Sequence, residues 1–289
     1  MERNKARIQL LIICLLFGTI GTFTRFIDMP SSVICFGRAF LAVITIIIVL
    51  MMKKQKVDWQ AIRSNFILIA ATGVCMCVNW VCQFEAFKYT TIATATLCYY
   101  IQPMFFIIMA TIVYREKLSL KKIICILTAF TGMVLVSGVL KVGFNLSELK
   151  GVIYAVVGAF FYAVILVLTK SFKDVSTLDS TLVQLTITTV VMLPYIMLTE
   201  DLGSLHITAQ GIICLMILGI VHTGIAYSIY FRTVQNLDAQ TVGIISYVDP
   251  VVAVMLSAFL LKEPLTLVII IGAVLILGAT AVSELTGDK

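Results

Sequence analysis

Charged residues are scarce in this sequence. Asp, Glu, Lys and Arg together make up 12% of its 289 residues, whereas 61% are hydrophobic and the mean hydropathy is +1.08. A soluble globule of this length needs far more polar surface than these residues can supply. The composition therefore excludes an ordinary soluble protein and predicts that the lipid bilayer is the main solvent.

Long polar segments are also lacking. The longest connections between apolar stretches are 53–64, 141–150 and 200–208, and none leaves room for a soluble domain. No Ala-x-Ala-like cleavage site follows the first apolar run, so we interpret that run as a membrane helix and not as a signal peptide. All chemistry is expected to take place in or between helices.

Metal-binding and catalytic motifs are absent as well. The sequence holds only two histidines, His206 and His222, and its eight cysteines form no CxxC pair. HExxH, GxSxG and paired-aspartate motifs do not occur. We therefore expect no metal site, no cofactor and no disulfide framework, and we interpret the cysteines as small apolar packing residues. An intramembrane enzyme is a remote alternative.

What the sequence does contain is a series of apolar runs of about 20 residues, the length of a membrane-crossing helix. The runs are uniformly apolar and too long for the alternating strands of a barrel. They predict an all-α integral membrane protein with ten transmembrane helices. The expected spans are 8–27, 31–52, 65–87, 91–113, 121–140, 151–169, 177–199, 209–231, 239–261 and 266–283.

The second half of the chain repeats the first at an offset of 147 residues. The matching positions are Tyr100, Pro103, Glu116 and Leu118, which recur as Tyr247, Pro250, Glu263 and Leu265. Each copy holds five spans, and an odd number inverts the second copy across the bilayer. We predict a first five-helix repeat over 1–140, a linker over 141–150 and a second, inverted repeat over 151–289. Inverted repeats usually enclose a substrate site near the midplane, which indicates a secondary transporter.

The positive charges predict the orientation. With both termini in the cytoplasm, 15 of the 21 Lys and Arg residues lie on the cytoplasmic side and five on the outer side, which favours an N-in, C-in topology. The same asymmetry accounts for the net charge of +6, so no nucleic-acid partner is expected. The predicted location is a cell membrane, with a bacterial cytoplasmic membrane favoured.

Ionisable residues inside the spans need a reason, because a charge at the bilayer centre costs about 2.5–3.5 kcal/mol on insertion scales. Asp249 stands half way along its span before Pro250, and its repeat counterpart Gln102 precedes Pro103. Proline loosens the helix there. Burial favours the protonated carboxyl, so Asp249 is expected to exchange a proton during transport. The structural alternative is a permanent hydrogen bond to a tyrosine, a serine or Arg38.

Three further ionisable residues are candidates for coupling or charge relay. Arg38 retains its proton and must find a carboxylate, a helix C-terminus or an anionic group of the substrate, and the structural alternative is pairing with Asp249 or Glu85. Glu85 precedes Lys88 by three residues, so an ion pair near the headgroups competes with a role as a gate. His222 lies in mid-span, where a proton relay competes with a neutral hydrogen-bonding role.

Polar and aromatic residues predict the wall of a substrate cavity. A helical stripe, an i,i+3 pair and its repeat image point inward, and tyrosines on two other spans are expected to complete the lining. The predicted substrate-binding residues are Asn79, Trp80, Gln83, Phe84, Tyr99, Gln102, Tyr162, Tyr227, Tyr230, Ser246 and Asp249. Aromatic rings with one carboxylate suit an amine or other organic cation. They equally suit an aromatic or large apolar amino acid whose carboxylate binds Arg38.

Prolines and small residues predict where helices bend or slide. The expected hinge positions are Pro103, Pro250, Gly18 and Gly158, with static close packing as the alternative for the glycines. Glu116 and Glu263 stand at turns and are expected to cap the following helices.

The segments YREKLSLKKIICILTAFTGMVLV and LKEPLTLVIIIGAVLILGATAV carry a glutamate at a turn and then an apolar helix with glycine near its end. Together with the AFKYTTIATA stretch, Pro103, Pro250 and Arg38, they resemble the EamA family of the drug/metabolite transporter superfamily over essentially the whole chain. The resemblance implies ten helices in two inverted halves, alternating access around a central cavity, and metabolite substrates commonly coupled to protons or another ion.

We therefore predict a secondary active transporter of a small metabolite, an amino acid, an amine or a related organic cation. Export is favoured, with protons as the expected coupling ion through Asp249 and with membrane lipid as the surroundings of a monomer or homodimer. The alternatives are a facilitative carrier or an importer of an organic cation or nucleoside. A channel or scaffold is remote, because no filter-like motif or ring of like charges is present.

Overall fold

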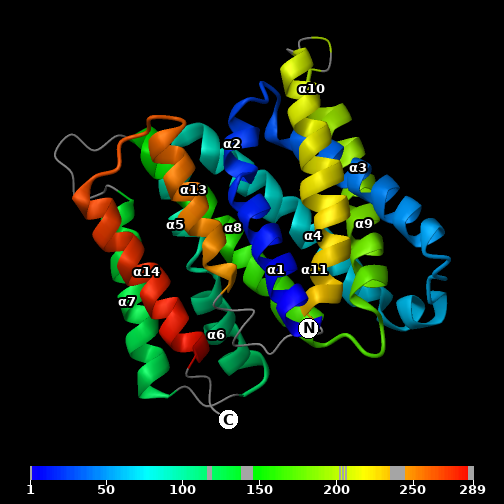
Figure 1. Ribbon diagram of the computed structural model, residues 1–289, viewed down its shortest axis with the longest axis horizontal. Helices are drawn as coiled ribbons and strands as arrows, with labels where there is room; N and C mark the ends of the chain where they lie inside the picture. The colour runs from blue at the N-terminus through cyan, green and yellow to red at the C-terminus, as the bar shows by residue number, and fades with distance from the viewer. Residues whose placement is uncertain are drawn as a thin grey trace.

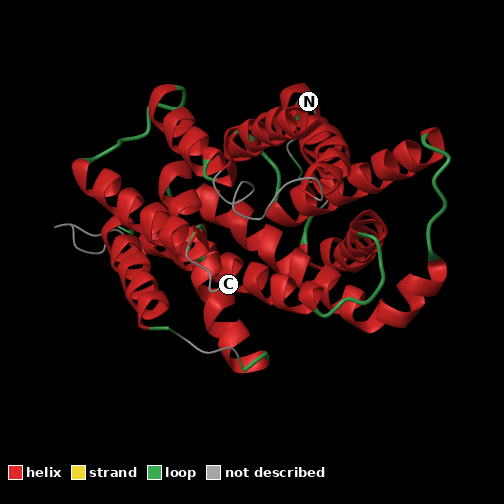
Figure 2. Ribbon diagram, turned by 60° about the horizontal axis from the view of Figure 1, so that its bottom comes forward, coloured by secondary structure: helices red, strands yellow, loops and turns green. Residues whose placement is uncertain are grey.

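The computed structural model describes residues 2–115, 119–137, 146–201, 203, 205, 207–234 and 245–285. Within these ranges the regular elements are helices, and no β-strand occurs among them (Figure 2). The prediction of an all-α protein is confirmed. The helices, in chain order, are α1 (Glu2–Gly18), α2 (Ile20–Arg25), α3 (Ser31–Met52), α4 (Trp59–Tyr89), α5 (Ile92–Tyr99), α6 (Gln102–Val113), α7 (Leu120–Val136), α8 (Leu146–Lys170), α9 (Thr177–Thr199), α10 (Ala209–Met216), η2 (Ile217–Ile225), α11 (Ala226–Val234), α13 (Val248–Phe259) and α14 (Leu267–Leu285).

These helices fall on the predicted spans in order. α1 and α2 share the first span, α5 and α6 the fourth, and α10, η2 and α11 the eighth. Seven stretches of the described residues are long and apolar enough to cross a membrane, and α13 and α14 supply shorter apolar helices. The fold is thus a multi-pass helical membrane bundle. Only part of the predicted span 239–261 lies within the described residues, and the count of ten spans and the orientation stay predictions.

Helix packing follows the internal repeat. α7 packs along α14, α3 along α9 and α5 against α13, and each pair joins corresponding spans of the two halves. Figure 1 shows α7 and α14 side by side at one edge of the bundle. The packing of α4 against α8 has its counterpart in the contact between α11 and α1. The contacts are those expected of two halves related by a pseudo-two-fold axis.

Apolar side chains cover the outside of the bundle. Met52, Ile67 and Leu198 are 80%, 83% and 85% exposed, as lipid-facing residues are. The cysteines, in contrast, are buried except for the half-buried Cys75, in agreement with the packing role predicted for them. These large apolar side chains thus face the lipid, while most of the small cysteine side chains are packed inside the bundle.

The turn before the last span of each half has the same backbone conformation. Arg115 and Lys262 correspond in the repeat, and each has a φ of 55°, in the left-handed region. Ser119 and Thr266 follow, and each hydroxyl accepts a hydrogen bond from the amide three residues later, at 3.3 Å. The two halves thus start α7 and α14 with the same N-cap.

This capping overturns one expectation from the sequence. Glu263 does not cap α14, because Thr266 occupies the N-cap position and the Glu263 carboxylate points instead to the start of α5. Glu116, the corresponding residue of the first half, lies outside the described residues.

Candidate functional site

A cavity of about 720 Å³ lies between the two halves. Its volume is within the usual range for small-molecule sites. Every residue predicted to contact substrate lines this one cavity, and Arg38, Gly18 and Pro103 line it as well. The sequence-predicted set that the cavity brings together consists of Asn79, Trp80, Gln83, Phe84, Tyr99, Gln102, Tyr162, Tyr227, Tyr230, Ser246 and Asp249.

Helix breaks place several of these side chains. α5 ends at Tyr99 and α6 begins at Gln102, with Pro103 in its first turn, as the proline predicts. In the second half, α13 begins at Val248 with Pro250 in its first turn. The two helix starts therefore both contribute side chains to the cavity wall, Gln102 from α6 and Asp249 from α13.

Asp249 has a partner from the other half of the chain. The Tyr100 hydroxyl donates a hydrogen bond of 2.7 Å to the Asp249 carboxylate. This bond joins α13 to the break between α5 and α6. Tyr100 was not among the predicted site residues, although its recurrence as Tyr247 marked it as part of the repeat.

Arg38 pairs with neither of the carboxylates proposed for it. Its Nε donates to the Thr223 hydroxyl at 2.7 Å, and its guanidinium carbon lies 4.2 Å from the centroid of the Trp80 ring and 5.8 Å from that of Phe84. Asp249 bonds to Tyr100 instead, and no carboxylate of a described residue forms an ion pair with Arg38. The predicted structural pairing is therefore wrong.

The irregular helix η2 explains this position of Thr223. η2 is a π-helical stretch, in which the wider turn displaces side chains from the α-helical register, and such stretches are frequent at functional sites. Sequence periodicity gives no signal for it, so the Arg38 partner was missed.

Two clusters of aromatic residues form the remaining wall of the cavity. The amide of Asn79 donates to the Tyr99 hydroxyl at 3.0 Å and to the Gly158 carbonyl at 2.8 Å, which fixes α4 against α5 and α8. The ring centroids of Tyr99 and Tyr162 are 6.0 Å apart. On the opposite side, Phe17 contacts the rings of two tyrosines predicted for the wall, Tyr227 at 5.9 Å and Tyr230 at 6.0 Å. Phe17, an ordinary apolar residue of the first span, was not predicted.

Glu85 and His222 do not line the cavity. The Glu85 carboxylate accepts a hydrogen bond from the Lys88 ammonium group at 3.0 Å, which is the ion pair given above as the structural alternative to a gate. His222 is 1% exposed, and its ring nitrogens contact the Thr19 hydroxyl at 2.7 Å and the Ile217 carbonyl at 3.2 Å. These positions match the structural alternatives for both residues.

The two predicted glycine hinges differ in how tightly they pack. A Cβ atom on Gly18 would lie 2.6 Å from Cβ of Val252 and 2.7 Å from the Asp249 carbonyl oxygen. A Cβ atom on Gly158 would lie no closer than 3.4 Å to the Asn79 carbonyl oxygen, an ordinary contact. Gly18 is thus required for the close approach of α1 to α13, whereas Gly158 leaves room for a methyl group.

We expect Gly18→Ala to destabilise the protein and Gly158→Ala to be tolerated. The added methyl group at position 18 overpacks against backbone, which typically costs about 1–3 kcal/mol. Thermal unfolding in detergent measures the difference, and Gly158→Ala is the matched control on the corresponding helix of the other half. Equal melting temperatures for the two variants would contradict the close packing at Gly18.

The cavity reaches one end of the bundle. Lys122, Thr169 and Thr177 line it where α7 begins, α8 ends and α9 begins. This is the end where α1 begins and α14 finishes, the lower end in Figure 1. The positive-charge distribution predicts that it faces the cytoplasm.

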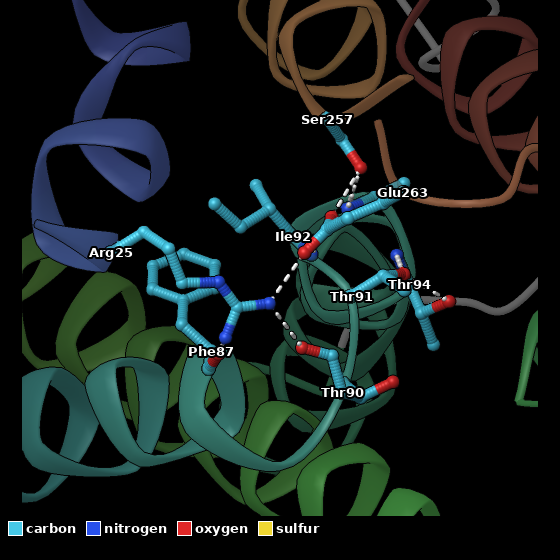
Figure 3. Close-up of polar contacts among 9 residues, drawn as sticks. Arg25, Phe87, Thr90, Thr91, Ile92, Thr94, Ser257 and Glu263 are labelled. Carbon is cyan, nitrogen blue, oxygen red and sulfur yellow. Dashed lines mark hydrogen bonds and ion pairs between the residues drawn. The ribbon is translucent and has the colours of Figure 1, made fainter. Parts of the chain in front are cut away.

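At the other end of the bundle an ion-paired cluster lies next to Phe87, a residue of the cavity wall. The Arg25 guanidinium donates to the carbonyls of Phe87 and Thr90 and pairs with the Glu263 carboxylate (Figure 3). Glu263 also accepts from the Ile92 amide at 2.8 Å and from the Ser257 hydroxyl at 2.5 Å. The cluster therefore ties together the end of α2, the turn between α4 and α5, and the end of α13.

Comparison with known proteins identifies the chain's relatives. The sequence pattern of the EamA-like transporter family matches residues 4–138 and 149–284. The uncharacterized transporter YxxF of Bacillus subtilis (strain 168) is 28% identical over 259 residues, covering 89% of this chain and 82% of that one. An uncharacterized transporter of Archaeoglobus fulgidus is 23% identical over 273 residues, covering 93% and 92% of the two chains. The family and these names indicate a transporter rather than an enzyme.

One solved structure has the same fold. It is titled only "Crystal structure of protein", and it superposes with a TM-score of 0.69 at 19% sequence identity, covering 99% of both chains. At this identity the similarity concerns the fold alone.

Proposed function

Because the chain belongs to the EamA-like transporter family and is thus a membrane transporter, we propose that it moves a small amine-bearing metabolite by alternating access. The cavity between the repeats is the proposed binding site. Its volume of about 720 Å³ suits a metabolite and excludes a macromolecule.

Asp249 is the observation that carries this proposal. It is the acidic side chain among the described residues of the cavity wall, where it stands among the rings of Tyr99, Tyr162 and Tyr227. A carboxylate supplies a charge partner for an ammonium group, and the faces of aromatic rings attract cations. The binding energy of such a site exceeds what either group gives alone.

Proton coupling is proposed to use the same carboxylate. Tyr100 donates a hydrogen bond to one of the two oxygens of this carboxylate. A proton and an ammonium group would compete for Asp249, so proton binding from one side displaces substrate, which is the requirement for exchange. The cavity extends to the predicted cytoplasmic end, so it is open to the side from which an exported substrate enters.

A thermal-shift screen tests the proposal. The purified protein is exposed to amino acids, polyamines, quaternary amines and nucleosides at two pH values, because a ligand of the folded state must raise its melting temperature. We expect a saturable rise from amine-bearing compounds that is smaller at low pH. A rise from nucleosides alone would favour the facilitative or import alternative, and no rise in folded protein would contradict the proposed site.

A further inference from the structure

Arg38 is a buried cation without an anionic partner among the described residues. It is 4% exposed, yet it lines the cavity, and it contacts a neutral hydroxyl and two aromatic rings. Burying a charge is costly unless it is paired. Cation–π contact with Trp80 offsets part of that cost, but it supplies no acceptor for the guanidinium N–H groups.

The geometry of the guanidinium favours one kind of ligand. Nε is occupied by Thr223, and the planar group lies over Trp80, so its orientation is fixed from two sides. The terminal nitrogens then present two parallel N–H donors, the arrangement that binds a carboxylate with two hydrogen bonds. A fixed orientation before binding also lowers the entropic cost.

The second charge of the cavity belongs to the other half of the chain. Arg38 comes from α3 and Asp249 from α13, and both line the cavity together with Tyr99 and Tyr227. A substrate that touches these two tyrosines is therefore positioned between opposite charges. An ammonium group suits one end of the site and a carboxylate the other.

We propose that Arg38 is the subsite for an anionic group of the substrate, so that the transported molecule is a small zwitterion with its carboxylate on Arg38 and its ammonium on Asp249. This inference rests on the proposed function, from which it takes the ammonium group. Trp80 and Thr223 act as positioning residues, because they hold the guanidinium and do not themselves carry charge.

Three compounds that differ only at the carboxylate test this inference. They are L-phenylalanine, phenylalaninamide and 2-phenylethylamine, with the leucine series as a second set, and the readout is the melting temperature as a function of compound concentration. We expect the amino acids to bind at least about tenfold more tightly than their amides and amines, the effect of one charge-assisted contact.

Variants of Arg38 connect that preference to the guanidinium. Arg38→Gln should remove the preference for the carboxylate, whereas Arg38→Lys, which keeps the charge but not the planar fork, should keep part of it and serves if the first variant does not fold. Amines that bind as tightly as the amino acids would overturn the Arg38 subsite and leave the proposed function standing. Absence of binding by every compound would overturn both.

A second inference comes independently from the cluster in Figure 3. A smaller hollow of about 270 Å³ lies beside it, lined by Arg25, Lys88 and Thr90, and it shares no lining residue with the main cavity. Phe87 lines the main cavity, and its carbonyl accepts from Arg25. The cluster therefore stands between the cavity and this second hollow.

The cluster also has the features of a latch. Arg25 and Glu263 are 32% and 12% exposed in their side chains, so the pair is partly shielded from water but not locked in the core. It joins α2 of the first half to the segment after α13 of the second half, which are elements that alternating access must separate. The Ile92 amide and the Ser257 hydroxyl stabilise the carboxylate in this position.

We infer that the Arg25–Glu263 pair is the latch that closes this end of the cavity. Opening to this side requires the pair to part, while opening to the other side leaves it intact. The Lys88–Glu85 pair, in contrast, lies within one helix and opposes no such movement.

Labelling of a cysteine at position 20 tests the latch without any substrate. Ile20 lines the cavity near the cluster. In a background without the native cysteines, Ile20→Cys is treated with a membrane-impermeant maleimide from the side on which Arg25 lies. We expect Glu263→Gln and Arg25→Gln to raise the labelling rate by about tenfold, because losing the pair shifts the population toward the open state.

The control variant is Lys88→Gln, which removes a neighbouring ion pair and should leave the rate unchanged. If both latch variants have the melting temperature of the Ile20→Cys protein and are labelled at the same rate as that protein, the inference is overturned. Equally fast labelling in Lys88→Gln would overturn it too, because the effect would then follow from any loss of charge at this end.

Discussion

Replacing Asp249 by Asn will abolish transport driven by a pH gradient and leave the protein folded in the membrane. Asn has nearly the same shape as Asp and can accept the hydrogen bond from Tyr100. Its amide, however, does not take up a proton at physiological pH. Proton movement and substrate movement are then no longer linked. The measurement is the accumulation, in proteoliposomes with and without an imposed pH gradient, of an amine that raises the melting temperature of the protein.

Tyr100→Phe is the matched control for this prediction. It removes the hydrogen bond to Asp249 but keeps the carboxylate, so gradient-driven accumulation should be reduced and not lost. Undiminished accumulation by a folded Asp249→Asn variant would remove Asp249 from the coupling mechanism. The binding site would then need another explanation for its carboxylate.

The second large effect is expected at Trp80. Trp80→Ala removes the ring under the Arg38 guanidinium and a wall of the cavity. Without the ring the guanidinium is no longer held in one orientation before binding, so binding must order this side chain and ligand affinity should fall by roughly tenfold. Because Trp80 is 7% exposed, its truncation also costs about 3–5 kcal/mol of stability.

Trp80→Phe separates these two effects. It keeps an aromatic face for Arg38 and most of the packing volume, so both affinity and melting temperature should stay closer to the wild type. Titration calorimetry of the two variants with the best ligand makes the comparison. Wild-type affinity in a folded Trp80→Ala variant would contradict the role of this ring.

Much of the fold could be predicted from the sequence because the bilayer imposes length and apolarity on every span. α3 and α9 begin and end where their apolar runs predict. The extra turns at the start of α4 were not predicted, because residues 59–64 mix polar and apolar side chains and are helical outside the apolar run. Hydropathy reports the membrane and not the full length of a helix.

The cavity wall could be predicted for a related reason. Asn79 and Trp80 share a face with Gln83 through helical spacing, and the repeat relates Gln102 to Asp249. The partners of these residues could not be predicted, because Tyr100 with Asp249, Thr223 with Arg38 and Arg25 with Glu263 are contacts between distant segments. Neither periodicity nor the repeat offset specifies which side chains meet across the bundle.

Counterflow in proteoliposomes is the most direct test of the central claim that the cavity carries a small molecule across the membrane. Vesicles preloaded with a compound that raises the melting temperature are diluted into a trace of the same labelled compound. We expect transient, saturable accumulation of label, because each unlabelled molecule carried out of the vesicle returns the binding site to the outside, where it takes up labelled compound. Absence of accumulation in vesicles that hold folded protein, or label entry that does not saturate, would contradict a carrier with its substrate site between the two halves.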